Sequence, residues 1–519
     1  MIRINFARTP REDNTSLSDF IGNLIETTDF SFEIRKKSLD ARRNKAKFVY
    51  TVDIFVKGDE EAVAQKCGGT VLPPEEEYIF PAAKNMPKHR PVVAGFGPGG
   101  IFAALMLARQ GLKPIVLERG KRGDQRKKDV DAFFAGGELN PNSNIQFGEG
   151  GAGAFSDGKL NTLVKDKGFR GQYILKELVA AGAPAETMYI AKPHIGTDLL
   201  RGVVENIRNE IIALGGEILF ETPLTDIVTD GEGICAVIAG GKEIKTDSLF
   251  LATGQSAKDI AKMLYHHGAD IEKKPFSVGF RIEHPQEMIN ASQYGENGDM
   301  RFLPPAEYKL FTHCKTGRTV YSFCMCPGGH VVNASCEEGY LVTNGMSYHA
   351  RDGMNANAAI LCEILPSDLG DDIFAGFDYR EDLEQKAFNL GGKDFTAPAM
   401  FVGEYLGTHA PLTRHIAPTY PRGVRYCDIS TLFSDEINAS FKEALKDFGK
   451  KIKGFDSANA IITAVESRTS SPIRITRGDD RQSNIKGIYP IGEGAGYAGG
   501  IISAAIDGLK SAESYILGL

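Results

Sequence analysis

The sequence is poor in the features that mark secreted, fibrous and membrane proteins. Its eight cysteines are scattered along 519 residues without a compact framework, which argues against a disulfide-stabilised secreted fold and favours a reducing compartment. It has no internal repeat and no low-complexity tract. The first residues, Met1 to Phe6, lack the charged n-region, apolar stretch and cleavage site of a signal peptide. We therefore expect a cytoplasmic globular protein.

An excess of positive charge and an uninterrupted hydrophobic run are also missing. The net charge is -7 and the pI about 5.9, so the surface as a whole does not form a nucleic-acid footprint. The most apolar stretch, residues 91–108, contains glycines and an internal proline. A membrane helix tolerates these poorly, whereas a buried strand followed by a phosphate-binding turn requires them. Both observations disfavour a membrane or a nucleic acid as partner.

The chain is too long for one ordinary core, and its texture changes along its length. Residues 1–88 predict a small α/β module that ends in a proline-rich linker. Residues 89–274 and 457–519 predict two parts of one Rossmann-like α/β domain, and residues 275–456 a β-rich α+β domain inserted between them. Expected elements include helices at 18–28, 198–213, 380–389 and 435–451, and strands at 47–57, 318–326, 330–335 and 340–343.

A glycine-rich turn carries the strongest local signal. An apolar strand leads into G-x-G-x-x-G at Gly95, Gly97 and Gly100, with Pro98 and Gly99 between them, and an apolar helix follows. In such a turn the first glycine makes the bend, the second lets backbone amides approach a pyrophosphate, and the third lets the helix pack on the strand. The motif alone is weak evidence for a dinucleotide, but its setting between strand and helix strengthens it.

Acidic and small residues occur where a dinucleotide needs them. Glu118 ends the next strand, 23 residues after Gly95, where a carboxylate can accept both hydroxyls of an adenosine ribose. Arg119 could stack beside the adenine or be solvated. Two remote segments then favour FAD over NAD, because each ends an apolar strand at residues that permit close contact with a cofactor. These are Ala252, Thr253 and Gly254 in one, and Gly492, Glu493, Gly499, Gly500 and Ile501 in the other.

Together these motifs resemble the glutathione-reductase-like FAD superfamily. They are more closely similar to its uncharacterised bacterial FAD-dependent dehydrogenases, relatives of tRNA-modifying flavoproteins and geranylgeranyl reductases. The resemblance covers Pro91 to Leu519. It implies FAD as cofactor, with the first turn on the pyrophosphate, Glu118 on the ribose and the helix after Ile501 facing the flavin pyrimidine. It also implies that Glu493 binds the ribityl or phosphate region, although the superfamily usually has aspartate there.

A second glycine-rich run, residues 147–160, predicts a loop laid against a planar ligand, with a flexible surface loop as the alternative. In related flavoproteins this position borders the isoalloxazine. A lysine there would stabilise the negative charge of the reduced flavin, which makes Lys159 a candidate catalytic residue. The cofactor-binding candidates in this run are Gly150, Gly151, Ser156, Asp157, Gly158 and Lys159.

Two further segments are candidates for catalysis. Cys324 and Cys326 lie on an expected strand that would place both thiols on one face. They are compatible with a redox dithiol, with zinc binding, or with buried thiols that shape a substrate pocket, and we predict no metal site. Arg468, among hydroxyl residues, could bind an anionic substrate or the flavin edge, or be solvated.

These residues predict an FAD-dependent oxidoreductase that transfers a hydride through flavin N5 to or from an unidentified small molecule. Only one dinucleotide fingerprint is present, so NAD(P)H, if used, would bind transiently. An alternative arises from residues 35–47, which hold seven basic residues and one acid, Asp40. This segment could make the protein an RNA-associated flavoprotein through Arg42, Arg43 and Lys45, or it could be a solvated hairpin.

Overall fold

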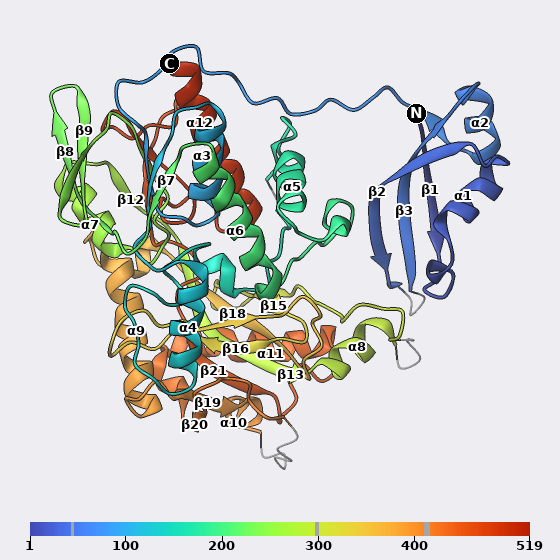
Figure 1. The fold of residues 1–519 in the computed structure, drawn as a ribbon. Coiled ribbons are helices and arrows are strands. Elements are labelled where there is room, and N and C mark those ends of the chain that lie inside the picture. The colour runs from blue at the N-terminus through green and yellow to red at the C-terminus, as the bar shows by residue number, and fades with distance from the viewer. Residues whose placement is uncertain (43–45, 163, 296–299, 409–415) are drawn as a thin grey trace.

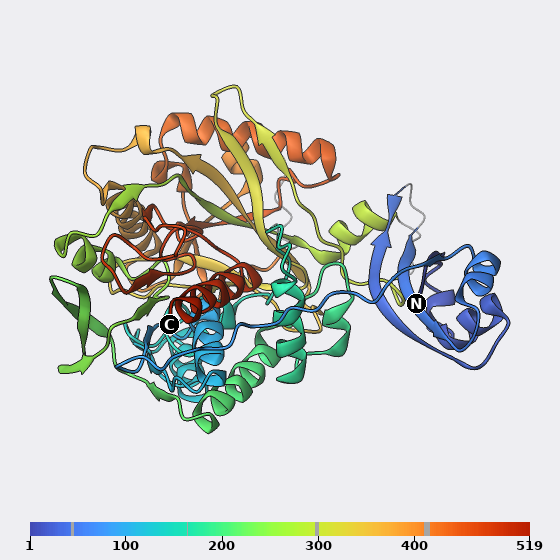
Figure 2. The same cartoon turned by 90° about the horizontal axis from the view of Figure 1, so that it is seen from above.

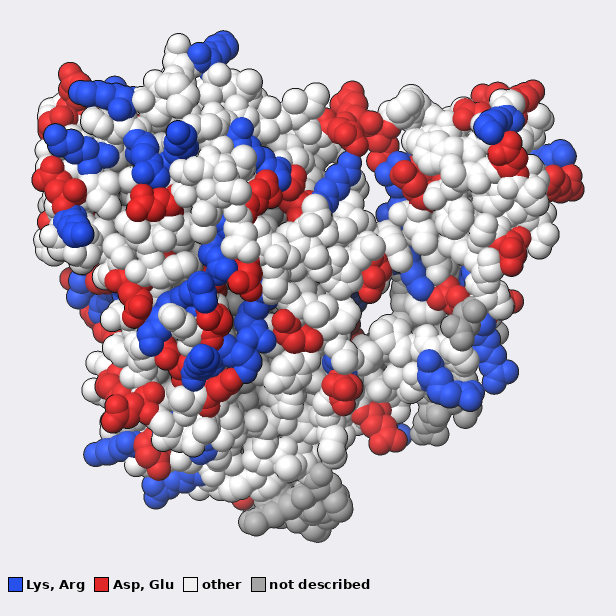
Figure 3. Space-filling view, viewed as in Figure 1, with Lys and Arg blue, Asp and Glu red and all other residues white. Residues whose placement is uncertain are grey.

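A computed structural model describes residues 1–42, 46–162, 164–295, 300–408 and 416–519 (Figure 1). Arg43 and Lys45 of the basic segment therefore lie outside the described residues. Within the described part, three basic side chains of this segment are paired: Arg35 binds Asp53, Lys37 binds Asp13 and Arg42 binds Asp40. On the face shown in Figure 3, cationic and anionic side chains are interspersed.

The N-terminal residues form a separate β-α-β-β-α-β unit with one four-stranded sheet of order β2-β3-β1-β4. Residues on β3 alternate between buried and exposed at its start because helices cover only one sheet face. The helix expected at 18–28 and the strand expected at 47–57 are confirmed with small shifts. The elements are β1 (Ile2–Arg8), α1 (Leu17–Ile25), β2 (Phe30–Asp40), β3 (Lys47–Val56), α2 (Glu60–Cys67) and β4 (Thr70–Val71).

An extended segment, residues 72–91, joins this unit to the rest of the chain without a helix or strand of its own. It runs across the top of the molecule in Figure 1 and along one side of the body in Figure 2. The hydroxyl of Tyr78 donates to Glu513, and its ring lies 5.0 Å from that of Tyr173. The linker is thus attached to the body by side chains.

The main body contains a five-stranded parallel sheet of order β23-β11-β5-β6-β7. In chain order this is the 3-2-1-4-5 arrangement of a Rossmann-type fold. Its short strands are apolar because helices α3 (Pro98–Arg109), α5 (Arg170–Ala180), α6 (Thr197–Ala213) and α12 (Ile501–Gly518) pack on one face, while α7 (Lys258–His266) and a three-stranded sheet pack on the other. The strands are β5 (Val92–Ala94), β6 (Ile115–Leu117), β7 (Glu217–Leu219), β11 (Leu249–Leu251) and β23 (Ile488–Pro490).

Among the helices that surround this sheet, α6 confirms the helix expected at 198–213. The helices are α3 (Pro98–Arg109), α4 (Gly123–Phe134), α5 (Arg170–Ala180), α6 (Thr197–Ala213), α7 (Lys258–His266) and α12 (Ile501–Gly518). The smaller sheets contain β8 (Leu224–Asp230), β9 (Gly233–Ala239) and β10 (Lys242–Lys245), and the pair β12 (Ile271–Lys273) and β22 (Ile473–Ile475).

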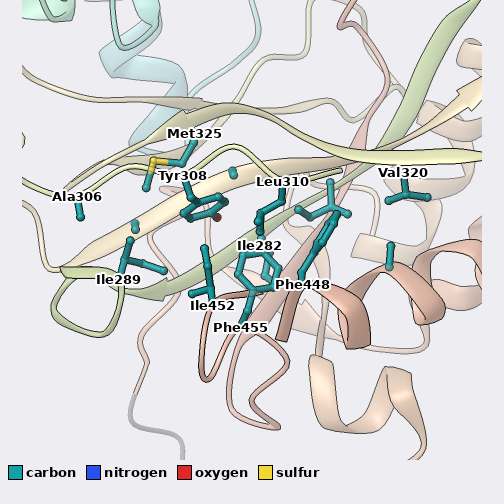
Figure 4. Close-up of a cluster of buried hydrophobic side chains, with 14 of the residues drawn as sticks. Ile282, Ile289, Ala306, Tyr308, Leu310, Val320, Met325, Phe448, Ile452 and Phe455 are labelled. Atoms are coloured by element: carbon teal, nitrogen blue, oxygen red, sulfur yellow. The ribbon is translucent and has the colours of Figure 1, made fainter. Parts of the chain in front are cut away.

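Between β12 and β22 the chain builds a second layer around a seven-stranded sheet of order β14-β15-β18-β13-β21-β19-β20. Figure 4 shows part of the core on one face of this sheet, where Ile282 and Val320 of the strands lie in one hydrophobic cluster with Phe448 of helix α11 (Asp435–Lys451). The strands are β13 (Phe276–Pro285), β14 (Phe311–His313), β15 (Thr319–Cys326), β18 (Asn355–Ile364), β19 (Ala397–Phe401), β20 (Val424–Tyr426) and β21 (Ile461–Glu466).

The remaining elements of this layer confirm the expected helices at 380–389 and 435–451. They are α8 (Gln286–Tyr294), α9 (Ala375–Gly391), α10 (Val402–Leu406) and α11 (Asp435–Lys451), with the hairpin β16 (His330–Asn333) and β17 (Thr343–Met346). The expected strand at 340–343 is wrong, because β17 begins where it was expected to end. Leu341 and Val342 are buried, but Leu341 donates its N–H to the backbone of α9 rather than to a strand.

The overall architecture confirms the predicted fold class: a Rossmann-type α/β domain with an inserted β-rich α+β domain and a small N-terminal α/β unit. Among the described residues, no helix combines the length and apolarity that crossing a bilayer requires.

Candidate functional site

A cleft opens at the carboxyl edge of the parallel sheet, where ligands of open α/β sheets bind. It is lined by the turns after β5, β6, β11 and β23, by residues 146–148 and 151–153, and by the start of α12. The sequence-predicted residues that it brings together are Gly95, Gly97, Pro98, Gly99, Glu118, Arg119, Gly151, Ala252, Thr253, Gly254, Gly492, Glu493, Gly499, Gly500 and Ile501.

The first glycine turn is shaped by contacts that leave no room for a side chain. Gly95 has φ +97°, and a Cβ there would lie 2.3 Å from the carbonyl oxygen of Ala252. A Cβ on Gly100 would lie 1.9 Å from the carbonyl oxygen of Gly95. Gly100 does not line the cleft; it allows α3 to pack on the turn, which is the role expected of the third glycine.

Two helices present their N-termini to this cleft. Gly97 precedes α3 and Gly500 precedes α12, and both residues line the cleft. Because Gly97 has no side chain to cap α3, the first N–H groups of that helix are left for a ligand. Each helix start also carries the positive end of a helix dipole. The cleft therefore has two sites suited to electron-rich groups.

Glu118, which the sequence predicts to bind an adenosine ribose, lines the cleft and is buried. Its carboxylate accepts N–H groups from Phe96 at 2.8 Å, Gly120 at 2.8 Å and Gly148 at 2.9 Å. It therefore holds the glycine turn, the end of β6 and the glycine-rich loop together. Arg119 beside it contacts Asp259 and lies over the ring of Phe147 at 4.6 Å.

Arg126 of α4 organises the glycine-rich loop, and sequence reasoning missed it. The side chain is fully buried and donates to the backbone carbonyls of Asn144, Ile145, Gly148, Glu149 and Gly151. Burial lowers its pKa to about 10, although Glu118 and Glu149 oppose this shift. The only sequence signal is a basic residue on a weakly amphipathic helix, which is also typical of a solvated surface.

At the other end of the cleft, the carboxylate of Glu493 is bound by groups of the protein itself. It accepts the N–H of Ser471 at 2.7 Å and lies 3.6 Å from Lys274. Burial raises its pKa, and Lys274 opposes the rise. Asp507 of α12, also missed from sequence, accepts the N–H of Gly492 at 2.8 Å and so fixes the turn after β23.

Several predicted residues lie outside the cleft lining. Asp157 and Lys159 form an ion pair of 3.1 Å, and Asp157 also binds Arg351 with an Nε–Oδ1 distance of 2.9 Å. The Nζ of Lys159 donates to the carbonyl of Met325. The predicted residues absent from the lining, within the described chain, are Gly100, Gly150, Ser156, Asp157, Gly158 and Lys159.

The three remaining catalytic candidates are also placed away from the cleft. Cys324 is half-buried and Cys326 fully buried at the end of β15, where a bulge breaks the simple alternation expected for a strand. Arg468 binds Glu384 through two bonds of 3.0 and 2.6 Å. It lines a separate small cavity that shares only Ser256 with the main cleft.

Other lining residues were not named individually as candidates from the sequence. Four of them, Phe147, Gly148, Ala152 and Gly153, belong to the glycine-rich run 147–160 that was predicted to lie against a ligand. The rest carry no motif that distinguishes a cleft residue from a core residue. Together, these other lining residues are Ala94, Phe96, Leu117, Gln146, Phe147, Gly148, Ala152, Gly153, Leu224, Gln255, Ser256, Ala257, Ile260, Ile491, Ala498 and Ala504.

A parallel sheet with a glycine turn and two open helix starts defines a Rossmann-type dinucleotide-binding protein. Residues 275–469 match the family described as FAD-dependent protein, C-terminal domain-like, which confirms FAD as the cofactor. An uncharacterized protein of Clostridium beijerinckii is 46% identical over 493 residues, which cover 93% of this chain and 92% of that protein. The chain therefore belongs to the same family as this clostridial protein.

Solved flavoproteins resemble the chain more distantly. A geranylgeranyl bacteriochlorophyll reductase-like protein from Thermoplasma acidophilum is 12% identical with a TM-score of 0.35, over 84% of this chain and 80% of that one. L-proline dehydrogenase from P. horikoshii is 12% identical with a TM-score of 0.35, over 84% and 95%. These scores are too low to transfer a reaction or a substrate.

Proposed function

We propose that the protein is an FAD-dependent oxidoreductase that transfers a hydride to or from a small molecule. The observation that carries this proposal is the cleft with an open helix start at Gly97 and another at Gly500. A ligand with a pyrophosphate and an electron-rich ring suits this arrangement. The narrower relationship to the glutathione-reductase-like superfamily is part of the same proposal.

The residues present fit the cofactor. Gly97 has room for a ligand because a Cβ there would meet only the Cα of Gly151, at 3.6 Å. We assign the start of α3 to the pyrophosphate, Glu118 to the adenosine ribose, and the start of α12 to the flavin pyrimidine. Lining residues such as Ile491, Ala498 and Ile501 exclude water from the flavin end.

FAD, when bound, supplies a hydride donor or acceptor at N5. The chain binds and orients it, and the α12 dipole favours negative charge at the end of the cleft near Gly500. We further propose that NAD(P)H, if it is the reductant, binds transiently, because the sequence carries one dinucleotide fingerprint.

The test combines cofactor binding with reduction. The purified protein should contain FAD or recover it on reconstitution, and anaerobic addition of NADH, NADPH or a metabolite panel should bleach the flavin absorbance. If the protein binds FAD but none of these donors reduces the bound flavin, the proposal that it is an oxidoreductase using such donors is contradicted. A protein that cannot be loaded with FAD would contradict the assignment of the cleft.

The substitution Gly97→Ala tests that assignment directly. The backbone at Gly97, with φ -83°, accepts alanine, and the added methyl would occupy space next to the pyrophosphate. We expect FAD affinity to fall about a hundredfold, with an unchanged melting temperature of the apoprotein. Gly202→Ala is the matched control, because Gly202 lies on α6 with nothing within 4 Å of an added Cβ. Equal FAD affinity in the two variants would sink the assignment.

A further inference from the structure

The end of β15 has an irregular backbone at two cysteines. Phe323 pairs with Ala359 and Cys326 with Asn357, so β15 has one residue more than β18 over this interval. Cys324, within the bulge, has φ +44°, a left-handed conformation that residues other than glycine rarely adopt. The bulge separates the two thiols in exposure: Cys324 is half-buried beside the 39%-exposed Phe323, whereas Cys326 is fully buried.

A charged cluster contacts this bulge from a distant part of the chain. Lys159 donates from Nζ to the carbonyl of Met325, the residue between the two cysteines. The same ammonium lies 3.1 Å from Asp157, whose carboxylate is also bound by Arg351. Asp157 and Arg351 are buried, with 1% and 7% of their side chains exposed. Two cations, Lys159 and Arg351, thus share one carboxylate, and the described residues place no second carboxylate against Lys159.

The other ionisable groups around the cluster do not cancel this charge. Arg281 donates to the carbonyl of Cys324 at 2.8 Å, but Glu466 neutralises it through a second bond. His194 is kept uncharged because burial, followed by Arg351, lowers its pKa. The Lys159 ammonium is therefore the charged group that contacts the backbone between the two cysteines without a carboxylate of its own.

The two thiols have different environments. The Sγ of Cys326 donates to the carbonyl of Cys324 at 3.2 Å, which places this sulfur against the neighbouring cysteine residue. Burial raises the pKa of Cys326 to about 12, so it stays a protonated thiol at neutral pH. We propose that Cys324 is a peroxide-reactive cysteine, activated by Lys159, and that Cys326 is the second thiol that converts its oxidised form to a disulfide.

The chemistry requires only hydrogen peroxide as oxidant. The Cys324 thiolate attacks one peroxide oxygen, the O–O bond breaks, and Cys324 becomes a sulfenic acid while the released hydroxide takes a proton to form water. The Cys326 sulfur then attacks the Cys324 sulfur, an S–S bond forms and the S–O bond breaks. The second hydroxide leaves with the Cys326 proton as water. Two thiols lose two electrons, and peroxide is reduced to two waters. This activity does not depend on flavin turnover.

The experiment uses the full-length protein. Iodoacetamide labelling followed by peptide mass spectrometry compares Cys324 with Cys67, Cys235 and Cys427, which are also half-buried. We expect Cys324 to react about tenfold faster than Cys427 at neutral pH. Brief exposure to hydrogen peroxide should reduce the mass of the Cys324–Cys326 peptide by about 2 Da before the other three cysteines change.

Variants of Lys159 and Cys326 separate the two roles. Lys159→Met should slow labelling of Cys324 about tenfold, and Lys159→Arg should preserve the rate. Labelling of Cys427 and the melting temperature serve as controls for folding. Cys326→Ser should stop the oxidation at a sulfenic acid, which dimedone captures. Cys324 labelling no faster than that of Cys427, or unchanged in a folded Lys159→Met variant, would overturn the proposal. The comparison of Cys324 with the other cysteines of the wild-type protein tests the proposal even if the Lys159 variants do not fold.

Discussion

Individual side chains in this protein hold the cleft mainly by binding backbone groups. Glu118 accepts three N–H groups from separate segments, and Arg126 donates to the carbonyls of five consecutive or nearby residues. Charge-assisted bonds to backbone are stronger than neutral ones. A buried charge that is satisfied in this way is costly to remove, because its partners lose their bonds in a place that water cannot reach.

Asp157 provides a prediction of pH dependence at this scale. Although burial opposes the shift, Lys159 and Arg351 lower the pKa of Asp157 from 3.8 to about 2. A carboxyl with a depressed pKa in the folded state stabilises the protein above its unfolded pKa. The contribution of this carboxylate to the free energy of unfolding is about 2 kcal/mol, and it is lost as the pH falls from 3.8 toward 2. Asp157→Asn should reduce the free energy of unfolding by about 3 kcal/mol at neutral pH.

Urea unfolding measured across acidic pH checks this expectation. The difference between wild type and Asp157→Asn should narrow as the pH falls through the range between the two pKa values. The exposed Asp479, changed to asparagine, is the control and should leave the free energy of unfolding within about 0.5 kcal/mol. A difference that stays constant with pH would contradict the ion-pair explanation.

The same residues explain which part of the site could be predicted from sequence. Gly95, Gly97 and Glu118 lie within a single strand–turn–helix–strand unit, so their spacing alone indicates their places. Asp157 and Lys159 were predicted at the flavin from a local glycine pattern, but Arg351, which is distant in sequence, draws Asp157 into another cluster. Arg126 and Asp507 bind backbone groups of other segments, and such partners leave no pattern in the sequence.

At the scale of elements, the contact between α3 and α12 connects the two helix starts that open on the cleft. The helices cross where Gly99 of α3 meets Gly508 of α12. A Cβ on Gly508 would lie 2.0 Å from the carbonyl oxygen of Gly99, so the helices approach at backbone distance. This approach places both N-termini at one cleft although they lie about four hundred residues apart.

Gly508→Ala should therefore damage the fold and the cofactor site together. The added methyl cannot fit without separating α3 from α12, and we expect a loss of about 3 kcal/mol in the free energy of unfolding. FAD affinity should fall as well, because the starts of the two helices move apart. Thermal unfolding and FAD titration measure these effects, with Gly202→Ala on α6 again the control. A Gly508→Ala protein as stable as that control would show that the close approach is not required.

Periodicity predicted most of the elements that have a single exposed face. Helix α11 begins and ends at the expected residues, since its apolar side chains recur at helical spacing and Ser434 caps it. Periodicity fails where a buried segment forms hydrogen bonds to a helix instead of to a neighbouring strand, as Leu341 does. It also fails at the bulge of β15, because one inserted residue changes which side chains face the core while leaving the composition of the strand unchanged.

At the scale of the whole molecule, the pattern of the sequence indicated the order of the structural units along the chain. It did not indicate how the N-terminal unit is attached to the body. The N-terminal unit meets the body through backbone bonds between Lys37 and residues Tyr189 and Ala191, at 2.7 and 2.8 Å. Backbone contacts of this kind can be made by almost any sequence. The linker adds side-chain contacts, since Arg170 binds Glu513 at 2.8 Å and lies over the ring of Tyr78 at 5.4 Å.

The linker and the cofactor cleft are thus connected through opposite ends of α12. Gly500 at its start lines the cleft, and Glu513 near its end holds Tyr78 of the linker. A ligand that binds the folded helix raises the free energy of opening it, so FAD should also protect whatever packs on its far end. Trypsin should cleave after the exposed Lys84 or Lys88 about tenfold more slowly in the FAD-loaded protein than in the apoprotein.

Tyr78→Ala provides the comparison for this coupling. Removing the ring and its bond to Glu513 should speed cleavage of the linker in both the FAD-loaded protein and the apoprotein. It should also reduce the protection that FAD gives, because α12 then no longer holds the linker. By reciprocity, the same substitution should weaken FAD binding by the factor that it removes from the protection. Equal cleavage rates with and without FAD in the wild-type protein would mean that the linker is attached independently of the cleft.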